Sequence, residues 1–311
     1  MPSTVERLTQ KGLIRPPSWL ADNVIYETVM GSVAYGVSVD ISDFDTMGVC
    51  VPPKEMVFPH LAGRIEGFGR QHQKFVCYQK HHVLVPDDLG GRGREYDLNV
   101  YNIVHYFHLC MENNPNMVAS LFTPQDCVLH CTKIGNMIRD KRRIFLHKGC
   151  WHKFKGYAYS QLHKIRTRNP EEGSKRAEII DKFGWDVKFG YHTVRLLSEV
   201  EQILTEGDLD IRRNREQLKA IRRGEMTAED CIAWATTKEQ ALERAYETSQ
   251  LPYGPDEQAI KTLLFECLEE HWGSLKGCVY GESPLNAACR LMQDMQQLIN
   301  HYQVELNDGE R

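Results

Sequence analysis

The sequence predicts an α+β fold in which a mixed β-sheet occupies residues 1–130 and helices occupy residues 131–311. In the first part, short segments rich in β-branched and aromatic residues end near glycine or proline, as strands do. Beyond Pro124, apolar residues recur at three- and four-residue spacing, which is typical of amphipathic helices. A chain of 311 residues has room for two domains of ordinary size. We therefore expect a sheet domain followed by a helical domain, with the substrate held between them.

Strands alternate with turns and short helices in the first part. Residues 1–22 predict a polar helix or arm, and the glycine-rich segment 90–94 predicts a hairpin loop that offers Arg92 and Arg94 for a phosphate contact. Asn114-Pro115 ends a helix, because the residue before proline avoids the helical conformation. The expected strands cover 23–30, 44–51 and 73–79, and residues 83–86 either continue a strand or end one. A further strand starts near Arg94 and leads into the helix that ends at Asn114-Pro115. A short second helix is expected over 116–122.

The second part is expected to be helical throughout. Residues 127–143 have a mixed character, and we interpret them as the hinge between the two domains. Gly224 is expected to end a charged helix, since glycine is common directly after a helix. Predicted helices lie at 154–169, within 184–211, and at 212–223, 227–248, 257–271 and 283–302, the last two as packing support.

Composition excludes several classes of protein. Hydrophobic residues make up 41% and charged residues 26% of the chain, as in ordinary globular proteins. No apolar run approaches the roughly 20 residues that a membrane span needs, and the first residues lack a signal-peptide core. Ten cysteines include no Cys-x-x-Cys pair, which favours scattered thiols in a reducing compartment over a metal site at Cys127 and Cys131. We therefore expect a cytoplasmic protein with no membrane partner.

Positive charge is concentrated in one segment of a chain whose net charge is −4. Residues 133–168 carry eleven lysines and arginines against the single acid Asp140. Such a surplus favours a polyanionic partner, either a nucleoside triphosphate or an RNA or DNA strand. The alternative is an ordinary solvated helix face.

The most informative stretch lies between Val29 and Pro53. Gly31-Ser32 comes first and is a candidate phosphate-binding pair. A residue without Cβ lets a phosphate approach the backbone, and the amides and the serine hydroxyl can hold its oxygens. Asp43 and Asp45 follow at the start of a strand and should project from one face, because strand side chains alternate. Two neighbouring carboxylates are tolerated when a divalent cation lies between them, and oxygen ligands suit Mg²⁺ or Mn²⁺. The structural alternative is a glycine turn before an edge strand with two solvated aspartates.

This stretch resembles the signature of nucleotidyltransferases of the DNA polymerase β superfamily. More narrowly, GSVAYGVSVDISDFDTMGV (31–49) is similar to the RlaP family, whose members typically read GS-x-AYG-x-x-x-x-x-SD-x-D-x-x-GV. The matching blocks reach from about residue 29 to about residue 230. The resemblance implies a polymerase β-like N-terminal domain that uses a nucleoside triphosphate such as ATP as substrate.

The resemblance also implies a third carboxylate, Asp97, at the end of a strand before a helix. In a two-metal arrangement, one ion steers the triphosphate and the second, which needs its own ligand, activates the attacking hydroxyl. Glu95, on the same strand face, is the substitute ligand, and Asp97 is alternatively a helix N-cap. Asn102 and His105 depart from the acid and base that many relatives carry on the following helix, which puts contacts from that helix in doubt.

Two helices of the second part offer nucleotide contacts. Lys188, His192 and Arg195 fall at i, i+4 and i+7 on one helical stripe and could stabilise triphosphate charge, with His192 the one that is potentially neutral. They belong to Lys-x-x-x-His-x-x-Arg-Leu-Leu, which, with Ile-Arg-Arg-Gly-Glu (221–225), resembles the family's C-terminal signature. The earlier helix carries Tyr157, Gln161 and Lys164 on one face, where Tyr157 either stacks on a nucleobase or packs in the core.

These observations together predict a metal-dependent nucleotidyltransferase. Asp43 and Asp45 would bind both metals, and Asp97 the catalytic one. RNA is the first choice of acceptor, because the family is associated with RNA repair and because of the basic segment; a protein hydroxyl or a small molecule remains open. Two alternatives are a catalytically silent binding module and a metal-dependent phosphohydrolase or nuclease, although no histidine has ligand spacing to Asp43 or Asp45. The nucleotide base and the oligomeric state are not predicted.

Overall fold

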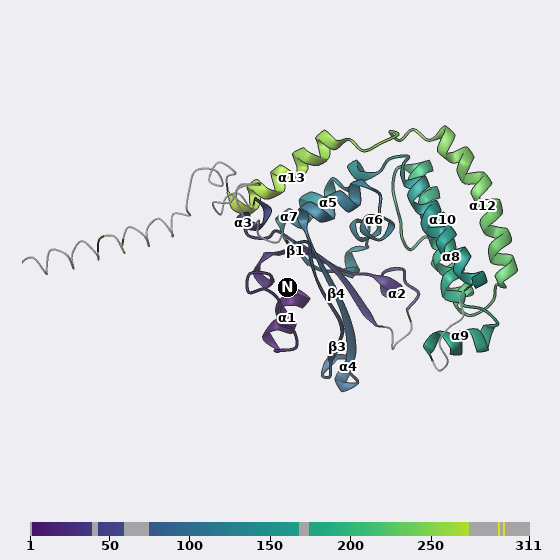
Figure 1. The fold of residues 1–311 in the computed structure, drawn as a ribbon, viewed down its shortest axis with the longest axis horizontal. Helices are drawn as coiled ribbons and strands as arrows, with labels where there is room; N and C mark the ends of the chain where they lie inside the picture. Colours follow the sequence, from purple (N-terminus) through teal and green to yellow (C-terminus); the bar gives the residue numbers. More distant parts are fainter. Residues whose placement is uncertain are drawn as a thin grey trace, which may run out of the picture.

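The computed structural model describes residues 2–38, 43–58, 75–167 and 174–273, together with the single positions 292 and 295 (Figure 1). The expected helix over 283–302 lies almost entirely outside the described residues, as do the first two residues of the strand expected over 73–79. Within the described part, no helix is both long enough and apolar enough to cross a membrane. The eight cysteines of this part are all free thiols.

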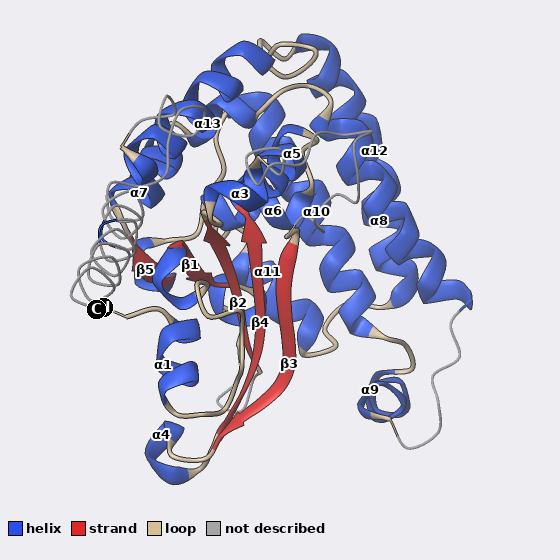
Figure 2. Ribbon diagram, turned by 60° about the vertical axis from the view of Figure 1, so that its left-hand side comes forward, coloured by secondary structure: helices blue, strands red, loops and turns tan. Residues whose placement is uncertain are grey.

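A five-stranded mixed sheet forms the centre of the described part, as the sequence predicts (Figure 2). The strand order is β3-β4-β2-β1-β5. Strands β2 and β4 run parallel, whereas the other neighbouring pairs are antiparallel. The strands are β1 (Val24–Val29), β2 (Phe44–Cys50), β3 (Cys77–Val85), β4 (Arg94–Asn102) and β5 (Val128–Cys131).

The two faces of the sheet belong to different hydrophobic clusters. Along β4, Leu98 and Val100 are buried against the face that α1 (Thr4–Gln10) covers. Asp97 and Asn99, at the alternate positions, project toward the other face, where the larger cluster lies. The helices α5 (Ile103–Met111), α6 (Pro115–Leu121) and α7 (Lys133–Asp140) contribute buried residues to this larger cluster.

Helices α8, α10 and α12 pack against one another beside the sheet, on the side away from α1 (Figures 1 and 2). Helix α13 returns to pack on α7 and α5. Helix α12 begins where the sequence predicts, because Thr227 and Asp230 form a reciprocal capping box. The helices of the second part are α8 (Cys150–Thr167), α9 (Lys175–Phe183), α10 (Val187–Glu206), α11 (Arg215–Arg222), α12 (Ala228–Thr248) and α13 (Glu257–Trp272).

The remaining helices are short. They are α2 (Gly31–Ala34), α3 (Lys54–Val57), α4 (Asp88–Gly91), and the 3₁₀ helices η1 (Ala21–Asn23), η3 (Gln125–Cys127) and η4 (Arg142–Phe145).

The helix expected within residues 1–22 is present as α1, although two of its residues, Val5 and Leu8, are fully buried and the segment is therefore not polar throughout. Another segment differs from its sequence-based interpretation. The hinge expected over 127–143 contains the edge strand β5, which pairs with β1, followed by α7. The expected domain boundary at residue 130 therefore falls inside a strand, and one continuous core extends from Ile25 to Leu268.

Candidate active site

Asp45 and Asp97 lie opposite each other on the parallel strands β2 and β4. Register partners on neighbouring strands project from the same face of a sheet, so both side chains leave the sheet on the face that α1 does not cover. Asp43, which is exposed, directly precedes β2. The fold thus brings together the three carboxylates that the sequence singles out.

Gly31 lies against the carboxylate of Asp45. Strands β1 and β2 are antiparallel, with Val29 opposite Thr46, so the chain that leaves β1 passes the start of β2. The Met30 amide donates to the Asp45 carbonyl over 2.8 Å, and Gly31 begins α2 with a left-handed φ of +62°. Ser32, the next residue of α2, is partly buried. The neighbouring carboxylate of Asp45 and the left-handed φ both favour glycine at position 31, because it has no Cβ.

Two arginines hold the end of α2 from a distant part of the chain. Nε of Arg212 donates to the Ala34 carbonyl over 2.9 Å, and a guanidinium nitrogen of Arg222 donates to the Val37 carbonyl over 2.7 Å. Sequence reasoning missed this role. The only signal for it was Ile-Arg-Arg-Gly-Glu, which includes Arg222 but does not indicate what the arginine contacts.

A cleft of about 400 Å³ opens beside Asp45, between the sheet and helices α6, α8 and α10. Six of the candidate residues line it: Gly31, Asp45, Tyr157, Gln161, His192 and Arg195. Ser32, Asp43, Asp97, Lys164 and Lys188 are not part of the lining. The lining residues that sequence reasoning missed are Met30, Thr46, Met47, Asn99, Pro115, Asn116 and Leu196.

The pKa of Asp45 is raised above its ordinary value. Burial is the largest cause, followed by the negative charges of Asp97 and Asp43, whereas Lys188 and His81 act in the opposite direction. Positive charge near Asp45 would relieve this repulsion, and carboxylate oxygens are the ligands that Mg²⁺ and Mn²⁺ prefer. The donor set around Asp45 therefore fits a divalent cation.

His192 is neutral at pH 7. Burial lowers the pKa of its imidazole well below the usual value, and the positive charges of Arg195, Lys188, Arg176 and Arg222 lower it further. Within the stripe on α10, the cations are therefore Lys188, which is exposed, and Arg195. The imidazole can still take part in a hydrogen bond as a neutral group.

Arg195 is a buried cation at the base of the cleft. Its guanidinium donates to Oδ1 of Asn116 over 3.3 Å and lies 4.7 Å from the centre of the Tyr35 ring. Nε is 3.9 Å from Oε1 of Glu199, whose side chain is also buried. Burial raises the pKa of Glu199, and Arg195 opposes this shift.

The three candidates on α8 differ in their surroundings. Tyr157 is 41% exposed and its hydroxyl accepts from Asn114, so the alternative of core packing does not hold. Gln161 lines the cleft beside it. The ammonium of Lys164 lies 5.8 Å from the centre of the Phe189 ring.

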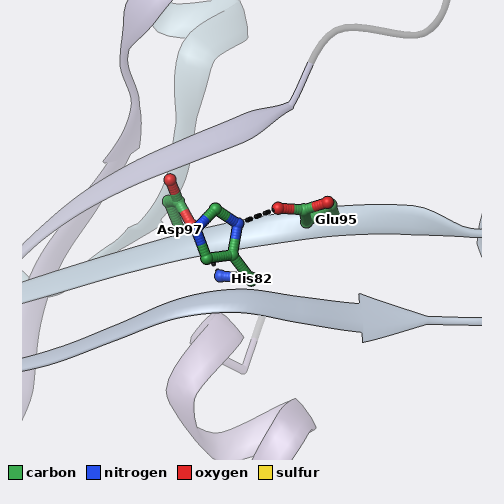
Figure 3. Close-up of side chains that lie close together, drawn as sticks. All are labelled: His82, Glu95 and Asp97. Atoms are coloured by element: carbon green, nitrogen blue, oxygen red, sulfur yellow. Dashed lines mark hydrogen bonds and ion pairs between the residues drawn. The ribbon is translucent and has the colours of Figure 1, made fainter. Parts of the chain in front are cut away.

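A bulge in β3 brings two histidines to Asp97. The backbone amide of His82 donates to Oδ1 of Asp97 over 2.8 Å, and its Nδ1 contacts Oε1 of Glu95 (Figure 3). Nδ1 of His81 is 3.5 Å from the same oxygen of Asp97. The hydrogen bond to Glu95, and the charges of Glu95, Asp97 and Asp43, raise the pKa of His82. Neither histidine was a candidate from the sequence, because strand spacing alone does not reveal a bulge.

The basic segment 133–168 is partly neutralised within the fold. Five of its eleven bases form ion pairs with acids from other parts of the chain, and Lys148 is buried. The local charge surplus therefore overstates the positive surface. The ion pairs are Lys133 with Glu270, Lys141 with Glu266, Arg143 with Asp208, Lys153 with Glu112, and Lys155 with Glu239 and Glu243.

Comparison with known proteins identifies a family for this chain. A search among curated proteins found no match. A solved structure, described as a nucleotidyltransferase-like protein from Exiguobacterium sibiricum 255-15, aligns with 11% identity and a TM-score of 0.27, covering 86% of this chain and 80% of the other. The family model described as RlaP, RNA repair pathway DNA polymerase beta family, matches residues 5–266. Because this match covers most of the sequence, the chain belongs to the RlaP family of polymerase β-type nucleotidyltransferases.

Proposed function

We propose that this protein transfers a nucleoside monophosphate from a nucleoside triphosphate to an acceptor hydroxyl on RNA, with Mg²⁺ or Mn²⁺ as cofactor. The observation that carries the proposal is the register of Asp45 with Asp97 beside the Gly31 turn. Asp45 lines a cleft that also holds Arg195, and Asp97 is its partner on β4. Family membership supports the same class of reaction.

The carboxylates Asp43, Asp45 and Asp97 would hold the cations, which when bound would neutralise triphosphate charge and make the acceptor hydroxyl more acidic. In the transfer itself, the acceptor oxygen forms a bond to the α-phosphorus while the bond from this phosphorus to the bridging oxygen breaks. Pyrophosphate leaves with that oxygen. Asp97, at the edge of the site, takes the hydroxyl proton and passes it to solvent.

The remaining candidates bind and orient the nucleotide. Gly31 and Ser32 would hold the terminal phosphates through backbone amides and the serine hydroxyl. Lys188 and Arg195 supply positive charge, and neutral His192 supplies a hydrogen bond. Tyr157 stacks on the base, and Gln161 hydrogen-bonds to its edge, with Lys164 farther along α8.

The acceptor is the part of the proposal with two candidates. RNA is supported by the family description and by the surplus of lysine and arginine over acids within 133–168. A small-molecule or protein hydroxyl is favoured instead by the pairing of five of those eleven bases. Chemistry at the α-phosphorus is the same in both cases.

The test is incubation of the protein with Mg²⁺, each of the four α-labelled nucleoside triphosphates in turn, and a short RNA with a free 3′ hydroxyl. The expected result is labelled RNA and one pyrophosphate per transfer. Pyrophosphate without labelled RNA would favour the other acceptors, and orthophosphate would favour hydrolysis. An absence of any product with every triphosphate, and of any triphosphate-dependent rise in melting temperature, would contradict the proposal.

A further inference from the structure

The hairpin of β3 and β4 contains an irregularity beside Asp97. The register between the two strands shifts between Lys80 and Val83, so His81 and His82 occupy the bulged positions. His82 has a φ of +56°, in the left-handed region that a residue with a Cβ rarely adopts. Such a conformation is unfavourable for a residue with a Cβ, and bulges are frequent next to ligand sites.

The bulge gathers metal-binding atoms of two chemical kinds. Figure 3 shows the imidazole of His82 between the carboxylates of Glu95 and Asp97, both of which project from β4. One ligand atom from each of these three side chains lies within 4.8 Å of the other two. His81 adds a second imidazole 3.5 Å from Oδ1 of Asp97.

We propose that His82, Glu95 and Asp97, with His81 beside them, form a second cation site that takes a divalent ion such as Zn²⁺ or Co²⁺ in preference to Mg²⁺. Imidazole nitrogen suits zinc and cobalt, whereas Mg²⁺ selects oxygen ligands in octahedral geometry. A mixed set of nitrogen and oxygen donors therefore discriminates against the ion that suits the Asp45 side of the cleft.

The second site overlaps the carboxylates proposed for catalysis at a single residue. Asp45 does not belong to the group whose ligand atoms lie within 4.8 Å of one another. Only Asp97 is shared, because it lies between the bulge of β3 on one side and β2 on the other. Cation binding at the bulge therefore does not depend on nucleotidyl transfer. The His82 and Glu95 side chains are 81% and 35% exposed, so solvent reaches the site and water can complete the coordination.

A purely structural role for the bulge is the competing explanation. The contact of His82 with Glu95 would then stabilise the hairpin as an ordinary exposed ion pair, and such pairs contribute little. This alternative predicts no cation preference. The two explanations separate on whether the imidazole of His82 binds an added ion.

The experiment is titration of the untagged full chain with Co²⁺, followed by visible absorption, which reports the coordination geometry of the bound ion. The key variant is His82→Asn, because asparagine tolerates a left-handed φ and keeps the amide that donates to Asp97. Glu95→Gln tests the second ligand without changing the shape of the side chain. His163→Asn, an exposed histidine on α8, is the control for non-specific imidazole binding.

We expect His82→Asn and Glu95→Gln each to weaken Co²⁺ binding by about tenfold or more, and an equal concentration of Mg²⁺ not to displace the bound Co²⁺. His163→Asn should bind Co²⁺ as the wild type does. Unchanged binding in His82→Asn, or an equal loss of binding in His163→Asn, would overturn the proposal. Because the readout is the spectrum of the metal, failure to transfer a nucleotide would leave this result intact.

Discussion

The backbone of Gly31 packs directly on the carboxylate of Asp45: a Cβ at position 31 would lie 2.1 Å from Oδ2. Gly31 begins the stretch 31–49 and Asp45 lies near its end, yet the antiparallel pairing of β1 and β2 brings the two residues together. The phosphate half and the carboxylate half of the motif therefore form one surface, and the position of one fixes the room available to the other.

Gly31→Ala should impair transfer more than stability. The added Cβ meets the end of a side chain, so the Asp45 carboxylate can rotate away and leave the fold intact while losing its place in the site. The left-handed φ adds a cost of about 1 kcal/mol. Gly12→Ala is the matched control, since Gly12 also has a left-handed φ, +70°, but has no atom near its missing Cβ. We expect similar losses of unfolding free energy in the two variants and at least about a tenfold loss of transfer rate in Gly31→Ala alone. Equal transfer rates would contradict the close fit.

Asp45→Asn should abolish transfer without destabilising the fold. Burial and the charges of Asp97 and Asp43 raise the pKa of Asp45, so its charged form is penalised in the folded state and stability falls as the pH rises through this titration. Asparagine removes that penalty. We expect a melting temperature at pH 7 equal to or above that of the wild type, and no further rise on adding Mg²⁺. Asp87→Asn, whose side chain is 87% exposed, should retain both transfer and the response to Mg²⁺.

The sequence predicts those elements best whose signals are local. Helix α12 begins after its Thr227 cap, and β1 and β2 lie within one residue of the segments expected from their composition. Strand β5 has only four residues, all of them half-buried, so it exists through pairing with β1 rather than through its own pattern. Helix α1 has seven residues, too few for a clear periodicity, and the sheet determines which of them are buried.

In the candidate site, too, local features could be predicted from the sequence and contacts between distant segments could not. Side-chain alternation in β2 indicates which face carries Asp45, but its neighbour Asp97 depends on the strand order of the whole sheet. The contact of Arg222 with the Val37 carbonyl joins residues 185 positions apart, and the bulge at His82 depends on pairing with β4. The charge surplus of 133–168 is misleading for a similar reason, because its counter-ions come from other segments, such as Glu266 on α13.

Glu27 should make the stability of the protein depend on pH. Its side chain is fully buried on β1, where Oε2 accepts from the amide of Thr4 over 2.6 Å, and burial raises its pKa from the ordinary 4.5 to about 7. Between these two values the folded protein keeps a proton that the unfolded chain loses. The free energy of unfolding therefore falls by roughly 3 kcal/mol as the pH rises through this window, and this contribution is constant above it.

Urea unfolding from pH 4.5 to 8 measures this dependence. Glu27→Gln keeps an acceptor for the Thr4 amide but cannot ionise, so its unfolding free energy should change less with pH than that of the wild type. Glu6→Gln, on the neighbouring helix α1, serves as the control and should retain the wild-type slope. A wild-type slope in Glu27→Gln would show that another group carries the pH dependence.

The pair of Arg195 and Glu199 should contribute to stability because both side chains are buried. Removing one member of a buried ion pair leaves the other charge without compensation, which costs about 3 kcal/mol or more. Glu199→Ala should therefore lower the unfolding free energy by about that amount. It should also weaken triphosphate binding, because Arg195 lines the cleft and Glu199 helps to position it. Glu201, like Glu199, is on α10, and its more exposed ion pair is with Lys238 on α12, so Glu201→Ala should cost about 1 kcal/mol or less. If the two variants lost equal stability, Glu199 would be protonated in the folded protein, since a neutral carboxyl leaves no charge for Arg195 to balance.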